Sequence, residues 1–118
     1  RHRLQNLTVL VDRNNIQIDG NTEEVMPLEP FREKYEAFGW NVLEIDGHNI
    51  RELVDAACEA EATYEAPTVI IAHTIPGKGV SFMENDYNWH GKPPNAEEAK
   101  KALVELRTLK GRIKSEHE

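Results

Sequence analysis

The stretch Thr68-Val69-Ile70-Ile71-Ala72 decides the fold, because its five consecutive small or β-branched residues show no alternation with charged side chains. A continuous run of this kind is typical of a strand buried on both faces, as in a parallel sheet. Leu7-Thr8-Val9-Leu10-Val11 has the same character, and Trp40-Asn41-Val42-Leu43-Glu44-Ile45 is a third strand candidate. Helical patterns alternate with these runs, so we expect an α/β fold with a parallel sheet and flanking helices on both faces. Three strands leave open edges that something else must complete.

Three helices are predicted from start signals and from apolar residues at helical spacing. The first follows Pro30, which is tolerated in the first turn of a helix. The other two follow Asn49 and Asn95, each with a glutamate three residues later, as in a capping box. The second helix is expected to bury Ile50, Leu53, Val54, Ala57 and Cys58. The last helix is expected to bury Ala99, Ala102, Leu103, Leu106, Leu109 and Ile113.

The composition limits the kinds of function that this chain can have. Its 118 residues include 21 acidic and 14 basic side chains, which gives a formal net charge of −7. That charge argues against general capture of nucleic acid or of an anionic membrane, since both need a basic face. No apolar run approaches the ~20 residues that span a bilayer. We therefore expect no nucleic-acid partner and no membrane association.

The single cysteine and the first residues bear on the compartment. Cys58 alone cannot form an internal disulfide framework or a cysteine-rich zinc module. Arg1-His2-Arg3-Leu4 lacks both the apolar core of a signal peptide and an initiator methionine. These features predict a reducing, cytoplasmic location and an interior piece of a longer chain.

The loop Asp12-Arg13-Asn14-Asn15-Ile16 follows directly on a predicted strand, and ligands of open α/β sheets bind beyond the carboxyl ends of the strands. An asparagine amide oxygen and a backbone carbonyl there are hard oxygen ligands of the kind that Mg²⁺ prefers. The alternative is a polar turn whose asparagines satisfy the loop backbone. From spacing alone the turn is the commoner explanation, because Asn and Asp are frequent in turns.

Two later loops also carry groups that could bind a ligand or take part in catalysis. In His73-Thr74-Ile75-Pro76-Gly77-Lys78-Gly79 the glycines allow close backbone approach to a ligand, and Lys78 could meet a phosphate. The spacing is not that of a P-loop, and an ordinary glycine-rich loop is the alternative. In Trp89-His90-Gly91-Lys92-Pro93, His90 is a candidate acid/base group or phosphate donor. The alternative there is a surface loop with a packed tryptophan.

Taken together, these segments resemble transketolases. Val11–Gly20 is similar to the second half of the family's thiamine-diphosphate motif, and Phe38–His48 is similar to the strand that follows it. His73–Val80 and Trp89–Pro93 are similar to two later loops of the family. The resemblance runs in order from about Leu4 to about Leu106, and split transketolases share it most closely.

The resemblance implies a role for five residues. Asn14 would bind the divalent metal, Mg²⁺ or else Ca²⁺ or Mn²⁺, through its side-chain amide, and Ile16 would bind it through its backbone carbonyl. This metal holds the diphosphate of thiamine diphosphate. Ile18 would pack against the cofactor. His90 would act as a catalytic residue that reaches the diphosphate and the substrate oxygens, and Lys78 would lie near the cofactor.

The resemblance also implies what residues 1–118 lack. The Gly-Asp-Gly motif that supplies a further metal ligand, the early histidines of the substrate channel and the cofactor-activating Glu are absent from this sequence. Residues 1–118 are thus expected to be a partial thiamine-diphosphate-binding domain without its upstream half. The expected function is that of part of a transketolase in the pentose phosphate pathway, which moves a two-carbon ketol unit between sugar phosphates.

The expected partners are further copies in a homo- or hetero-oligomer and a complementary C-terminal transketolase subunit. On its own, the isolated chain should be inactive. Two alternatives stay open at this point. One is another thiamine-diphosphate synthase, of the deoxyxylulose-phosphate or dihydroxyacetone synthase type. The other is a truncated, non-catalytic interaction module.

Overall fold

The chain forms two compact units in the computed structural model, which describes residues 4–108. Among these residues, 4–13 and 28–74 form one unit, and 14–27 and 75–108 form the other. The chain therefore passes from the first unit to the second after residue 13, returns at residue 28, and passes to the second unit again after residue 74. Within the described residues, no helix combines the length and the apolar character needed to cross a membrane.

A three-stranded parallel sheet is the centre of the first unit. Its order is β1 (Thr8–Arg13), β5 (Thr68–His73) and β4 (Asn41–Asp46), with β5 in the middle. Five consecutive residues of β5 are buried, from Thr68 to Ala72, which confirms the strand predicted from this stretch. Arg13 and Asp46 are both paired with His73, so all three strands end at the same edge.

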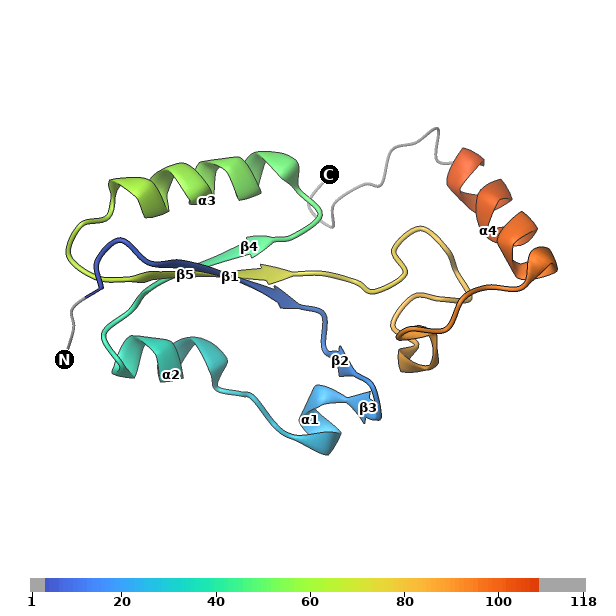
Figure 1. Ribbon diagram of the computed structural model, residues 1–118, viewed down its shortest axis with the longest axis horizontal. Helices are drawn as coiled ribbons and strands as arrows, with labels where there is room; N and C mark the ends of the chain where they lie inside the picture. The colour runs from blue at the N-terminus through green and yellow to red at the C-terminus, as the bar shows by residue number, and fades with distance from the viewer. Residues whose placement is uncertain (1–3, 109–118) are drawn as a thin grey trace. The chain divides into compact units, whose positions relative to one another are not determined.

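Two helices cover opposite faces of this sheet, α2 (Phe31–Ala37) on one side and α3 (Ile50–Ala62) on the other (Figure 1). The α2 face buries Val42, Val69 and Ile71, with Val9, Val11, Phe31, Tyr35 and Trp40 packed around them. The α3 face buries Ala56, Ala60 and Ile70, against which Leu43 and Ile45 pack. The parallel sheet with flanking helices is therefore confirmed.

The prediction that β1 is buried on both faces is wrong for the described residues. Leu10 is 60% exposed, because it lies on the α3 side of an edge strand while α3 packs on β4 and β5. A continuous apolar run in β1 thus has one covered face and one open face.

The predicted apolar stripe of α3 is also wrong, except at Leu53, which is half-buried. Ile50 and Val54 are 72% and 55% exposed and Ala57 and Cys58 are exposed, whereas Ala56 and Ala60 face the sheet. Both sides of this helix carry apolar residues, so the 3.6-residue period cannot choose between them. Small alanine side chains let the helix backbone lie close to the sheet, and that face is the one that packs.

The second unit begins with a short hairpin formed by β2 (Ile16–Gln17) and β3 (Gly20–Asn21), with a turn at residues 18–19 between them. The one-turn helix α1 (Thr22–Val25) follows directly. Residues 75–95 form loops that include the short 3₁₀ helix η1 (Tyr87–Trp89).

The helix α4 (Ala96–Thr108) starts at the predicted capping box. The side chain of Asn95 accepts from Glu97 N and Glu98 N at 3.0 and 2.9 Å, and Glu98 accepts from Asn95 N at 2.7 Å. Its predicted stripe is only partly buried, since Leu103 is 51% exposed while Ala99, Ala102 and Leu106 are half-buried. Leu109 and Ile113 lie outside the described residues.

Two apolar-to-alanine substitutions, one at the buried centre of β5 and one on the exposed side of α3, should differ greatly in their effect on the free energy of unfolding. Ile71→Ala should lower the free energy of unfolding by about 2–5 kcal/mol, because Ile71 is 1% exposed and its removal leaves a cavity. Val54→Ala should change it by no more than about 0.5 kcal/mol, because Val54 is 55% exposed. Denaturant titration measures both, and similar losses would contradict the exposed position of Val54.

Candidate functional site

The loops that carry the candidate residues leave the sheet from adjacent points on its carboxyl edge. Thr74, directly after β5, donates its N–H to the carbonyl of Arg13 at 3.3 Å. Its hydroxyl also donates to the carboxylate of Asp12 near the end of β1. These two bonds join the ends of β1 and β5, so Asn14 and Ile75 start their loops from neighbouring positions.

Asn14 forms a tight turn at the start of the hairpin. Its Oδ1 accepts a hydrogen bond from the N–H of Ile16 at 3.1 Å, and Asn15 adopts a left-handed conformation with φ 62°. Asparagine tolerates this conformation better than most residues. The carbonyl of Asn15 then accepts from Thr22 N at 3.0 Å, which closes the base of the hairpin. The polar turn expected as the alternative is therefore present.

The hydrogen bond in this turn leaves the amide oxygen of Asn14 able to bind a cation as well. An amide oxygen has two lone pairs, and the bond from Ile16 N uses one of them. The side chain of Ile16 is buried, with 8% exposed, and its N–H is bound by Asn14, so both its side chain and its backbone N–H have fixed contacts. The structure thus brings together the two residues predicted to bind metal on one fixed turn.

The oxygen donors of this turn fit a divalent cation only in part. Mg²⁺ takes six oxygen ligands, and an amide oxygen and a peptide carbonyl would supply two neutral ones. Among the described residues no group of three or more His, Cys, Asp or Glu side chains could hold a metal ion. These two neutral oxygens carry no charge, so further ligands and compensating negative charge would have to be added to them.

Gln17, which the sequence did not single out, carries an orphan polar group beside this turn. Its Nε2 is buried and has no hydrogen-bond partner among the described residues. Burying an amide without a partner costs free energy, so such groups usually mark an ordered water or a ligand. No sequence signal distinguished Gln17, because a glutamine in a two-residue strand has no characteristic spacing.

His90 ends the 3₁₀ helix η1, where its N–H donates to the carbonyl of Tyr87 at 2.9 Å. Its ring is exposed, and β3 of the hairpin contacts η1. The rings of Trp89 and Phe82 pack edge to face, with their centroids 5.5 Å apart. The Lys92 ammonium lies 4.3 Å from the centroid of the Trp89 ring. The packed tryptophan of the alternative explanation therefore exists, and it holds the turn that presents His90 near the hairpin.

Lys78 lies in a separate tight loop and is half-buried. Gly77 has φ 75°, and a Cβ there would come within 2.7 Å of the Met83 backbone, so this glycine serves the loop itself. The N–H of Gly79 donates to Glu84 at 2.8 Å. Ile18 is 70% exposed on the hairpin, which leaves an apolar surface available to a flat ligand.

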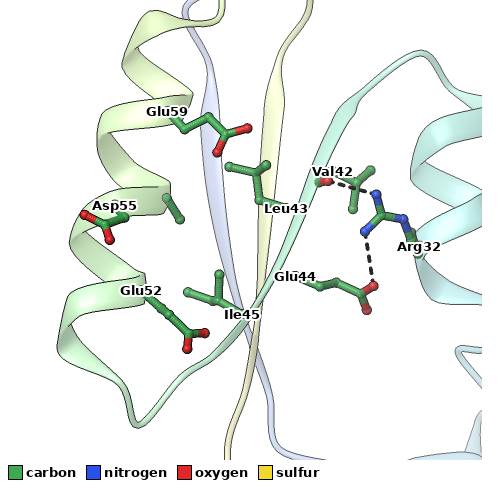
Figure 2. A pocket seen from close by; sticks show the side chains of 9 residues that line it. Arg32, Val42, Leu43, Glu44, Ile45, Glu52, Asp55 and Glu59 are labelled. Carbon is green, nitrogen blue, oxygen red and sulfur yellow. Dashed lines mark hydrogen bonds and ion pairs between the residues drawn. The ribbon is translucent and has the colours of Figure 1, made fainter. Parts of the chain in front are cut away.

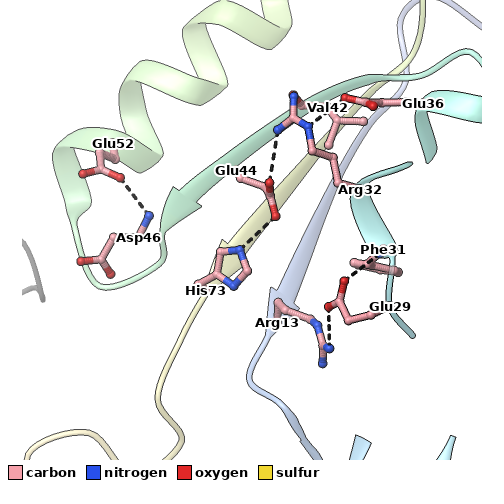
Figure 3. A network of polar contacts seen from close by, with 10 residues as sticks. All are labelled: Arg13, Glu29, Phe31, Arg32, Glu36, Val42, Glu44, Asp46, Glu52 and His73. Carbon is pink, nitrogen blue, oxygen red and sulfur yellow. Dashed lines mark hydrogen bonds and ion pairs between the residues drawn. The ribbon is translucent and has the colours of Figure 1, made fainter. Parts of the chain in front are cut away.

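Arg13 and Glu29 form an ion pair in the first unit (Figure 3). The guanidinium of Arg13, 4% exposed, donates to Glu29 Oε1 at 3.0 Å, and Glu29 Oε2 accepts from Phe31 N at 2.8 Å. The hydrogen bond from the Phe31 backbone and then that from Arg13 lower the pKa of Glu29 below its usual value.

A second network connects β5, β4 and α2 (Figure 3). Glu44 accepts from Arg32 at 3.2 Å and contacts His73 Nε2 at 3.1 Å, while Arg32 also donates to Glu36 at 2.8 Å. The hydrogen bond to Glu44, more than that to Glu36, raises the pKa of Arg32. This network fixes α2 against the sheet, and none of the predicted site residues takes part in it.

A groove of about 430 Å³ lies between α3 and β4, outside the predicted site (Figure 2). Its lining contains the four carboxylates of Glu44, Glu52, Asp55 and Glu59 and one cation, Arg32. Such a lining repels a diphosphate. Arg32 donates a hydrogen bond to the backbone carbonyl of Val42 on edge strand β4 at 3.2 Å. A further strand pairing with β4 would need such a carbonyl as a hydrogen-bond acceptor.

The sequence matches the family model of the transketolase thiamine diphosphate binding domain over residues 1–109. The chain is 42% identical over 106 residues to one subunit of the apulose-4-phosphate transketolase of Phocaeicola vulgatus, covering 90% of this chain and 38% of that protein. It is 44% identical over 104 residues to 6-deoxy-6-sulfo-D-fructose transketolase subunit SqwG of a Clostridium species, covering 88% and 38%. Transketolase from Campylobacter jejuni superposes with a TM-score of 0.79 at 34% identity, covering 90% and 16%.

The parallel α/β fold and the family match place the chain among thiamine-diphosphate-binding domains. It belongs to the transketolase family, which confirms the resemblance seen in its motifs. The chain spans 38% of the length of each of the two subunits that it matches.

The lowered pKa of Glu29 predicts how stability depends on pH. The charged carboxylate stabilises the fold, so its contribution is present well above the ordinary pKa of 4.5 and is lost as the pH falls through the lowered value. The free-energy difference between wild type and Glu29→Gln should therefore be largest near neutral pH and shrink in acid. Urea titrations at several pH values measure it, and a difference independent of pH would contradict the ion pair.

Proposed function

We propose that this chain is the part of a transketolase that holds the diphosphate end of thiamine diphosphate through a divalent metal. The main support for this proposal is the turn in which the Asn14 amide oxygen accepts a hydrogen bond from Ile16 N. The second support is that the chain belongs to the transketolase family. Asn14 Oδ1 and the Ile16 carbonyl bind Mg²⁺, or Ca²⁺ or Mn²⁺ in its place. The neutral charge of these two ligands leaves the cation free to attract the diphosphate.

The other site residues act on the cofactor and the substrate. Ile18, with its exposed side chain, packs against the cofactor, and the exposed ring of His90 donates hydrogen bonds to the diphosphate and to substrate oxygens. Lys78 adds positive charge near the cofactor. When bound, thiamine diphosphate supplies a carbanion-stabilising group, while the protein supplies orientation and electrostatics.

The proposed reaction is the transfer of a two-carbon ketol unit between sugar phosphates. Two relatives are named as single subunits of their enzymes, which supports a split enzyme that needs a complementary C-terminal subunit. The transketolases among the relatives and solved structures favour ketol transfer over a deoxyxylulose-phosphate or dihydroxyacetone synthase. A cytoplasmic location and the pentose phosphate pathway stay predictions.

Residues 1–118 are proposed to be a partial domain whose upstream half contributes further metal ligands. The exposed Leu10 on edge strand β1 supports this, because a neighbouring strand with its own cover would bury that face. The chain on its own is then inactive, since two neutral oxygens cannot complete the metal shell.

Asn14→Ala in the complete protein should weaken metal and thiamine diphosphate binding together. The loss should exceed the ~10–100-fold that follows removal of a supporting outer-shell partner, because a direct ligand is removed. Asn14→Asp keeps both an acceptor for Ile16 N and a metal ligand, so it should retain binding. Asn21→Ala, an exposed change in the same hairpin, is the matched control. Calorimetric titration with Mg²⁺ and cofactor measures all three, and unchanged affinity in Asn14→Ala removes Asn14 from the site.

His90→Ala should reduce turnover by roughly 10²–10⁴-fold, the usual contribution of an acid/base group. The melting temperature should barely change, because the ring is exposed and no described residue hydrogen-bonds to it. Lys92→Arg in the same loop, which keeps a cation for the Trp89 ring, is the control and should keep turnover. Ketol-transfer assays at saturating cofactor measure the rates, and normal turnover in His90→Ala would show that His90 is not catalytic.

A further inference from the structure

The hairpin segment leaves and re-enters the first unit between two oppositely charged residues. Residues 14–27 belong to the second unit, while residues 13 and 28 belong to the first. Arg13 is the last residue of β1, and Glu29 lies two residues before α2 begins. The ion pair between them therefore closes the base of the segment that carries Asn14 and Ile16.

Each group of this pair has contacts that fix its position. The Arg13 side chain is 4% exposed and lies over the Phe31 ring at 5.9 Å, and the Arg13 carbonyl accepts from Thr74 N at 3.3 Å. Both oxygens of the Glu29 carboxylate are used, one by Arg13 at 3.0 Å and the other by Phe31 N at 2.8 Å (Figure 3). The pair thus connects the end of β1 to the first backbone N–H of α2.

The physical consequence is a loop with two fixed ends. Separating the ends would take the Glu29 carboxylate, itself 57% exposed, from a guanidinium that is 4% exposed. A charge-assisted hydrogen bond to a buried group contributes more to stability than an ion pair between two exposed side chains. Holding the ends together also reduces the number of conformations open to the residues between them. Asn14 is the first of those residues and follows Arg13 directly in the chain, so the backbone from which the Asn14 turn starts is held at Arg13.

We propose that Arg13 and Glu29 are positioning residues that fix both ends of the segment from Asn14 to Leu28, and thereby fix the metal-binding turn at Asn14. This inference rests on the proposed function for its effect on the cofactor. A purely stabilising role would be shared by the Arg32–Glu36 pair, which lies in α2, is 42% and 47% exposed, and does not flank the segment.

The experiment compares Glu29→Ala, Glu29→Gln and the matched control Glu36→Ala in the complete protein with its partner subunit. Calorimetry measures the affinity for Mg²⁺ with thiamine diphosphate, and hydrogen exchange measures protection of the Thr22 and Met26 amides, which bond within the segment. Glu29→Ala should weaken cofactor affinity by roughly 10-fold or more, as for other outer-shell partners, and speed exchange of both amides. Turnover at saturating cofactor should stay within about twofold, because no group that touches substrate is changed.

Glu29→Gln retains one acceptor oxygen where two are used, so its effects should lie between those of wild type and Glu29→Ala. It is also the variant to measure if Glu29→Ala does not fold. Glu36→Ala should leave affinity and exchange at wild-type values. Equal affinity and equal exchange in the Glu29 and Glu36 variants would overturn the proposal.

Failure of the proposed function gives a different result. If the wild-type protein binds neither metal nor cofactor, the metal-binding role of Asn14 is wrong, and hydrogen exchange alone then decides whether Arg13 and Glu29 fix the segment. Faster exchange only in the Glu29 variants would support the positioning role, and unchanged exchange would exclude it.

Discussion

The parallel pairing of β1 with β5 is the constraint on which the site depends. The strands run in register from Thr8 and Thr68 to Arg13 and His73, so they end together. Asp12 and Thr74, 62 residues apart in sequence, consequently form a hydrogen bond where the two strands end. The loops that carry Asn14 and His90 both start from that edge, and parallel sheets place their ligands there for the same reason.

The sequence predicted the central element of this sheet and missed what covers the outer ones. Val69 and Ile71 are buried as their run of β-branched residues indicated, because a central strand has neighbours on both edges and helices on both faces. Leu10 and Val54 look equally apolar in sequence but are exposed. Their burial depends on which face a distant element covers, and local periodicity carries no information about that.

The candidate site was predictable to a similar depth. Asn14 and Ile16 could be selected as candidates because residue type, position after a strand and a recurrent motif coincide on a few consecutive residues, and their metal-binding role stays a prediction. The Arg13–Glu29 pair was not, since 16 residues separate its members and no period links them. Gln17 was missed for a related reason: its orphan Nε2 is a property of what surrounds it, and only a folded structure reveals that.

The structural and the functional explanations of Asn14 turn out to be compatible. The bond from Ile16 N to Asn14 Oδ1 is what an ordinary polar turn requires, and it also determines where the amide oxygen points. An unconstrained asparagine would lose side-chain entropy when it bound a cation, whereas this one has already lost it on folding. A turn of this kind is therefore compatible with the metal ligand proposed at Asn14, and charged ligands would then have to reach the cation from outside the turn.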